Sequence, residues 1–115
     1  MRRGTTPDYI LTIPDHDLQG CAVFVTLRQN NQQVTLTGRR LNVRYEEGED
    51  AGTVITFRLT QQETLGLHVG QGQVQVRWVD ARGTAMCTEI DTVTVLPVLL
   101  EEVIEHEGRN GAEAG

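Results

Sequence analysis

The chain contains no lysine and no serine, although its 115 residues include 14 threonines. Without lysine it cannot form the P-loop that cradles nucleotide phosphates, nor the Schiff base of lysine-dependent enzymes. Without serine it lacks the nucleophile of every Ser-His-Asp triad. Several large classes of nucleotide-dependent and hydrolytic enzymes are therefore excluded.

Long apolar runs are also missing. No stretch approaches the roughly 18–20 apolar residues that span a bilayer, so we expect no membrane insertion. Met1–Pro7 carries two arginines but leads into no continuous apolar run, so it does not resemble a secretory signal. We expect synthesis and retention in a cytoplasm, or assembly into a particle built there.

Cysteines and aromatic residues are few. Two cysteines, Cys21 and Cys87, are too few for a disulfide framework. In a reducing compartment we expect both to be small buried hydrophobic residues. A disulfide bridge between them is the alternative, and it would form only if their strands lay face to face within about 6 Å.

Negative charge is concentrated in the last residues. Residues 1–100 carry nine arginines and eleven acidic residues, whereas residues 101–115 carry one arginine and five glutamates, for a net charge of −6 over the whole chain. This division predicts a β domain over residues 1–100 and an acidic, partly disordered tail over 101–115. Nucleic-acid binding requires a cationic surface, which this acidic chain does not offer, so we expect no binding to DNA or RNA.

Alternation of apolar and polar residues dominates the first hundred residues and is typical of β-strands. A bend at Gly38–Arg40 interrupts one run, and the apolar phase changes inside the run from Thr84 to Val95, as at a bulge or strand break. Polar turns containing glycine or asparagine separate the runs. The alternating runs lie at residues 9–13, 22–28, 34–43, 54–59, 73–78 and 84–95.

The pattern predicts an all-β fold, an immunoglobulin-like antiparallel β-sandwich of six or seven strands. The antibody signature is absent, because Trp78 lies close before Cys87 instead of shortly after the first cysteine, Cys21. The likeness is therefore one of architecture.

Two segments depart from alternation. Thr60-Gln61-Gln62-Glu63 is a capping box, which predicts one short helical turn over residues 61–65. Residues 97–107 place apolar side chains at helical spacings among glutamates, which favours a short C-terminal helix or tail whose stripe is buried on this domain or on a partner. We predict that the stripe binds a partner through Val98, Leu99, Leu100, Val103 and Ile104.

The residues capable of chemistry do not form a recognisable constellation. Asp15-His16-Asp17 follows Pro14 and is predicted to be a solvated turn, because a metal site needs three or four converging ligands. Trp78 is predicted to lie in the core, and the alternative is an exposed ring that stacks on a sugar. We assign no catalytic, metal-binding or cofactor-binding residue, and we expect neither a cofactor nor enzymatic activity.

Four segments carry a family resemblance over roughly residues 1–104, and they are Met1–Pro7, Leu59–Leu65, Val74–Arg77 and Val98–Ile104. In these segments the chain is similar to small tail-region proteins of phages and prophages of Gram-positive gut bacteria, some of which are reminiscent of the N-terminal sandwich of upper baseplate proteins. The acidic loop Glu46–Gly52 and the tail after Ile104 depart from that likeness.

The resemblance implies a structural or assembly protein of the tail or baseplate region, located in the virion, that acts through contacts with other tail proteins or with itself as a homo-oligomer. Two other functions remain open: a small ligand- or glycan-binding sandwich that uses Trp78, and a regulatory protein made by a prophage inside its host.

Overall fold

The computed structural model describes residues 1–106, which form eight strands, one 3-10 turn and one helical turn. The elements are β1 (Asp8–Pro14), β2 (Ala22–Gln29), β3 (Gln32–Thr37), η1 (Gly38–Arg40), β4 (Asn42–Glu46), β5 (Gly52–Arg58), α1 (Gln61–Leu65), β6 (Gly70–Val79), β7 (Ala85–Cys87) and β8 (Asp91–Val95).

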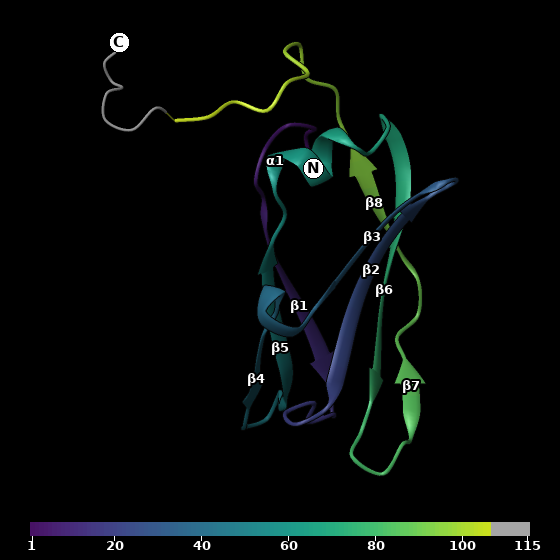
Figure 1. Ribbon diagram of the computed structural model, residues 1–115. Coiled ribbons are helices and arrows are strands. Elements are labelled where there is room, and N and C mark those ends of the chain that lie inside the picture. The colour runs from purple at the N-terminus through teal and green to yellow at the C-terminus, as the bar shows by residue number, and fades with distance from the viewer. Residues whose placement is uncertain (107–115) are drawn as a thin grey trace.

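The strands form two antiparallel layers, which confirms the all-β sandwich (Figure 1). One sheet has the order β1-β5-β4, and the other has the order β3-β2-β6, with both β7 and β8 paired to the far edge of β6. These orders match strands B-E-D and C′-C-F-G of an immunoglobulin-like sandwich. All pairings between these strands are antiparallel.

The core lies between the two layers and contains Trp78, which is 6% exposed. Its position confirms the prediction from alternation and leaves no ring face for stacking on a sugar, so a glycan-binding function would need another surface. The buried hydrophobic cluster consists of Ile13, Leu18, Val23, Val25, Leu27, Leu36, Ile55, Phe57, Leu59, Val76 and Trp78.

The predicted bend at Gly38–Arg40 is the point where the chain changes sheets. β3 belongs to the larger sheet, η1 follows, and β4 pairs with β5 in the smaller one. Gly38 has φ +60°, a conformation that residues with a side chain rarely adopt. The apolar run 34–43 therefore supplies two strands in different layers, and together with the break within residues 84–95 this gives eight strands, one more than the predicted six or seven.

The predicted phase change within residues 84–95 is a break between β7 and β8. Trp78 is in register with Met86, but Gly72 is in register with Val93, so the second pairing is offset by one residue. Thr88 fills the break: its amide donates to the Val76 carbonyl at 2.9 Å, and its hydroxyl accepts from the Val76 amide at 3.1 Å. One interrupted strand thus forms this edge of the sheet.

Of the predicted short C-terminal helix or tail, the described residues form a tail and no helix. From Pro97 to His106 the chain has irregular backbone. In a helix the Ile104 amide would donate to the Leu100 carbonyl, but here it donates to Gln61 Oε1 at 2.7 Å, and Gln61 Nε2 donates to the Ile104 carbonyl at 2.8 Å. A tertiary contact has replaced the helical one. The predicted disorder of residues 108–115 lies outside the described residues.

The expectation for the cysteines is also partly wrong. Both are free, and Cys21 is half-buried at the edge of the core, but Cys87 is exposed. Cys87 is in register with Arg77, whose side chain points away from the core, so Cys87 also lies on the outer face of the sheet.

In the part of the chain that the structure describes, no helix has the length and apolar character needed to cross a membrane.

Candidate protein-interaction site

The N-terminal residues pack against the end of β8. The Met1 ammonium donates to the Thr94 carbonyl at 2.8 Å, the Leu96 amide donates to the Met1 carbonyl at 2.7 Å, and the Arg3 amide donates to the Leu96 carbonyl at 3.0 Å. Arg2 and Leu96 form a parallel bridge. The beginning of the chain is thus tied to its own sheet near α1 (Figure 1), and Arg2 and Arg3 do not form a detached arm.

The helical turn α1 holds the next residues of the N-terminal segment. Thr64 is fully buried; its hydroxyl accepts from the Gly4 amide at 2.9 Å and donates to the Thr5 carbonyl at 2.9 Å. Gly4 has φ +79°, and a Cβ there would lie 3.4 Å from Leu65 and 3.7 Å from Val98. Gly4 therefore lets the N-terminal residues pass between α1 and the segment that follows β8.

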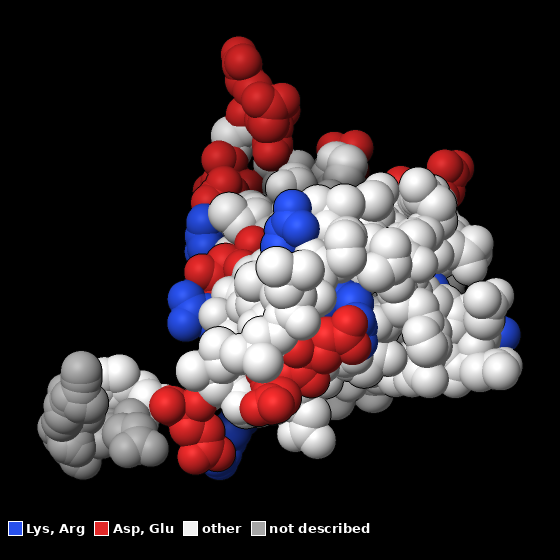
Figure 2. Space-filling view, turned by 90° about the horizontal axis from the view of Figure 1, so that it is seen from above, with Lys and Arg blue, Asp and Glu red and all other residues white. Residues whose placement is uncertain are grey.

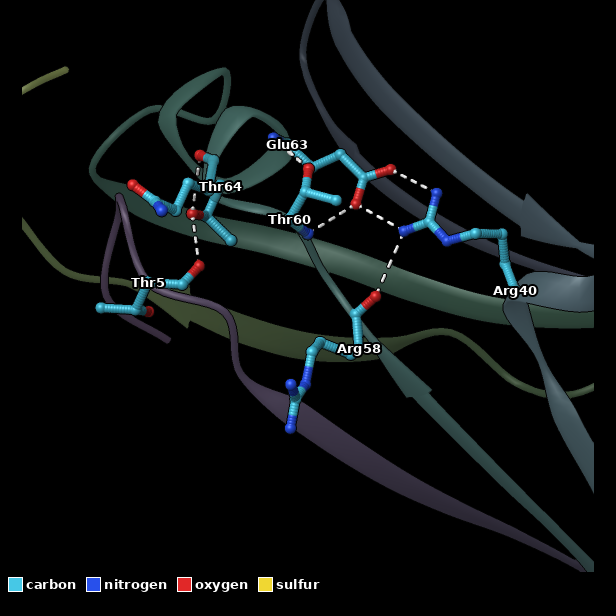
Figure 3. A network of polar contacts seen from close by, with 7 residues as sticks. Thr5, Arg40, Arg58, Thr60, Glu63 and Thr64 are labelled. Atoms are coloured by element: carbon cyan, nitrogen blue, oxygen red, sulfur yellow. Dashed lines mark hydrogen bonds and ion pairs between the residues drawn. The ribbon is translucent and has the colours of Figure 1, made fainter. Parts of the chain in front are cut away.

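An ion pair fixes α1 to the turn between the sheets (Figure 3). The capping box is present as predicted: the Glu63 amide donates to Thr60 Oγ1 at 3.0 Å, and the Thr60 amide donates to Glu63 Oε1 at 2.9 Å. Arg40 of η1 donates to both Glu63 oxygens, at 2.7 and 3.0 Å, and to the Arg58 carbonyl at 3.2 Å. The hydrogen bonds from Arg40 lower the pKa of the Glu63 carboxyl.

Residues 97–106, here called the C-terminal segment, lie over this end of the sandwich. Besides the pair of hydrogen bonds between Gln61 and Ile104, Arg2 Nη1 donates to the Pro97 carbonyl at 2.7 Å, and Arg3 Nη1 lies 3.3 Å from Glu101 Oε2. The segment is therefore tied at its beginning, middle and end, although it contains neither helix nor strand.

The five predicted partner residues lie together on this segment but differ in exposure. Val98 is half-buried against Gly4, whereas Leu99 is fully exposed and Leu100, Val103 and Ile104 are 52%, 47% and 62% exposed. Val98, Leu99 and Leu100 line a hollow of about 430 Å³ with Arg2 and Pro97. Four exposed apolar side chains thus stand on a segment whose backbone is held in place.

Glutamates lie among these apolar residues along the segment. Figure 2, seen from above relative to Figure 1, shows mostly uncharged surface with red acidic groups outnumbering blue basic ones. Glu101 is paired with Arg3, but Glu102 and Glu105 form no ion pair within residues 1–106. The segment combines apolar contact area with available negative charge.

The other sequence candidates have structural positions. Asp15 is in the predicted turn, and the His16 ring packs against the ring of Trp78, with centroids 5.4 Å apart. Across residues 1–106, no three His, Cys, Asp or Glu side chains converge as a metal site would require. Asp15, His16 and Asp17 are therefore not part of a set of three converging ligands within the described residues.

Sequence analysis did not assign a role to Gln29, which is buried. Its side chain accepts from the His68 amide and donates to the His68 carbonyl, both at 2.7 Å. The loop after α1 is therefore fixed to β2. The alternation of β2 contained the signal, since Val25, Leu27 and Gln29 share the inward face.

A hollow of about 370 Å³ opens between the two sheets beside β1 and β8. Tyr9 stacks on Phe57 there, with ring centroids 5.5 Å apart, and burial raises the pKa of the Tyr9 hydroxyl. Tyr9, Leu11, Val74 and Val93 pack against the buried cluster, so the hollow is the margin of the core.

Comparison with known proteins adds no relative: no protein-family model matches the chain, and no curated protein matches it.

Proposed function

We propose that this chain is a structural or assembly protein that acts through protein–protein contacts, with the C-terminal segment as its main contact surface. The observation that carries the proposal is the exposure of Leu99, Leu100, Val103 and Ile104 on a segment tied to the domain by side-chain hydrogen bonds. Grouped apolar side chains that remain exposed in this way are typical of interaction sites.

The anchoring of the segment supports binding physically. Ordering a flexible segment on association costs free energy, which a preorganised segment avoids in large part. Gln61 and Arg2 already hold the backbone at Ile104 and Pro97. The gain from removing the apolar side chains from water is then available to the complex.

The assignment to a phage or prophage tail or baseplate rests on the resemblance of four segments, of which Leu59–Leu65 and Val98–Ile104 form the end described above. Location in the virion follows from that assignment. A genome in which the coding gene lies among tail and capsid genes would support it, and repeated occurrence far from such genes would oppose it.

The contact surface is tested by the double variant Leu99→Asp/Ile104→Asp. The control is Ile10→Asp, because Ile10 is 69% exposed on a different face. We expect the double variant to weaken association with itself or with proteins encoded by neighbouring tail genes at least about tenfold, while the control changes it less than about twofold. The measurements are light scattering over a dilution series and titration with the purified tail proteins.

A chain that stays monomeric at all concentrations and binds none of those tail proteins would contradict the proposal. Association that survives in the Leu99→Asp/Ile104→Asp variant would move the contact surface elsewhere.

A further inference from the structure

The outer face of the larger sheet differs in charge from the rest of the molecule. The chain has 16 acidic residues, yet β2, β3 and β6 contain none. Glu89 lies at the break between β7 and β8, and Asp91 is in register with Val74, which lies at the margin of the core. The outward residues of β2, β3 and β6 are mostly threonine and glutamine, with Arg28 and Arg77 as the charged members.

Both arginines on this face are exposed and available. Four ion pairs occur within residues 1–106, and neither Arg28 nor Arg77 takes part in one. Both line a shallow hollow of about 300 Å³, whose other lining residues include Thr26, Gln33, Gln73, Gln75 and Ile90. Two positive charges therefore lie beside a polar depression.

Apolar side chains accompany the arginines. Phe24 is 40% exposed and in register with Arg77, while Ile90 is 57% exposed beside the hollow. Cationic and apolar side chains together suit a partner that presents acidic and apolar side chains together.

The C-terminal segment presents that combination. It carries two unpaired glutamates within the described residues, Glu102 and Glu105, among the exposed side chains of Leu99, Leu100 and Ile104. Two available negative charges match two available positive ones. The segment is tied to Gln61, Arg2 and Arg3 at the end of its own sandwich and makes no hydrogen bond or ion pair with this sheet face.

We infer that the C-terminal segment of one copy binds the outer face of β2, β3 and β6 of a second copy, with Glu102 and Glu105 near Arg28 and Arg77. The inference rests on the proposed function and names its partner. The two contacting surfaces are different, so the contact is heterologous, and an open assembly has one unused face at one end and one unused segment at the other unless a ring closes.

Charge reversal tests the inference. We expect Arg28→Glu/Arg77→Glu and Glu102→Arg/Glu105→Arg each to weaken self-association at least about tenfold, and an equimolar mixture of the two to recover it, because the reversed charges again attract. The matched control is Arg39→Glu/Arg82→Glu, which changes the same two charges at exposed arginines without an ion pair in residues 1–106. Sedimentation velocity over a concentration series measures the change, and circular dichroism establishes that each variant is folded.

A proximity measurement does not depend on charge. In a Cys21→Ala background, Leu99→Cys should form intermolecular disulfides with Cys87, which is exposed and in register with Arg77. We expect covalent dimers and larger species on a non-reducing gel. Ile10→Cys in the same background is the control and should give at least about fivefold less product.

The failures are distinguishable. If Leu99→Asp/Ile104→Asp abolishes association but Arg28→Glu/Arg77→Glu does not, the proposed function stands and this inference is overturned. The same holds if the chain is monomeric but binds a tail protein. A monomer that binds no tail protein overturns both.

Discussion

The outer faces of the two sheets have the same alternation but use their charged side chains differently. On the smaller sheet Arg58 donates to both oxygens of Asp8, at 2.7 and 2.9 Å, and Arg44 is 2.9 Å from Glu46. On the larger sheet Arg28 and Arg77 have no acidic partner within residues 1–106. One face therefore pairs its charges within the fold, whereas the other leaves its two arginines without an ion pair in the described residues.

The faces also differ in burial. Val54 points outward from the central strand β5, in register with Thr12 and Arg44, yet it is only 7% exposed. Thr26 of β2 occupies a comparable outward position but is half-buried, and its hydroxyl lies 3.2 Å from that of Thr35. Neighbouring side chains therefore cover the smaller sheet's outer face at Val54 in its central strand, and a substitution there should affect stability more than one at Thr26.

The largest expected difference between the two faces is in the free energy of unfolding after reciprocal Val and Thr substitutions. Val54→Thr should lower the free energy of unfolding by about 1–2 kcal/mol, because a hydroxyl would be placed where water has little access. Thr26→Val should change it by less than about 0.5 kcal/mol, since an exposed hydrogen bond contributes little. Urea denaturation measures both, and equal effects would contradict the comparison.

The second largest difference between the two faces should appear in the response to salt. Raising NaCl from about 50 to about 500 mM should increase the dissociation constant for self-association about fivefold, because unscreened charges on the larger sheet attract the glutamates of another copy. The free energy of unfolding should change much less, as exposed ion pairs contribute little. Sedimentation velocity and urea denaturation at the two salt concentrations test this. Association that is unchanged or strengthened by salt would indicate an apolar contact without charge pairing.

Acid should produce the smallest difference. Hydrogen bonds from Arg58 lower the pKa of the Asp8 carboxyl, so its stabilising contribution is complete above its unfolded pKa, near pH 4, and is lost as the pH falls through the lower folded value. Asp8→Asn should flatten the decline of stability below about pH 4.

Arg28→Gln is the control for acid stability and should leave that decline unchanged, since Arg28 has no carboxylate partner in the described chain. Urea denaturation midpoints measured between about pH 2.5 and pH 6 show whether Asp8→Asn flattens the decline of stability and Arg28→Gln does not. Hydrogen bonds from the backbone of the β6–β7 turn also lower the pKa of Asp80. Protonation of Asp80 should therefore cause part of the decline of stability in both variants.

Local features of the fold could be predicted because each depends on neighbouring residues. The capping box at Thr60–Glu63 needs atoms only three residues apart, and α1 has the predicted bounds. The break between β7 and β8 was visible as a change of apolar phase. The choice between a helix and a tail at the C-terminal segment could not be predicted locally, because Gln61, more than forty residues earlier, forms hydrogen bonds with the backbone of Ile104.

The five residues proposed to bind a partner could be predicted only as apolar members of a segment. Exposure divides them, because Val98 meets Gly4 while Leu99 meets solvent, and that distinction depends on where the N-terminal residues pass. Arg28 and Arg77 gave no separate sequence signal, since their significance comes from three strands without acidic residues becoming neighbours.

Alternation within the sequence establishes that the chain is β-rich, because it fixes which side chains can be buried once strands form. The turn at residues 61–65 is also set locally, since its hydrogen bonds close within the turn. Where the run at residues 34–43 changes sheets, which arginines have no ion pair within residues 1–106 and how the C-terminal segment is held depend instead on the packed structure. Those outcomes depend on atoms far apart in the chain, whose contacts exist only after the two layers have packed together.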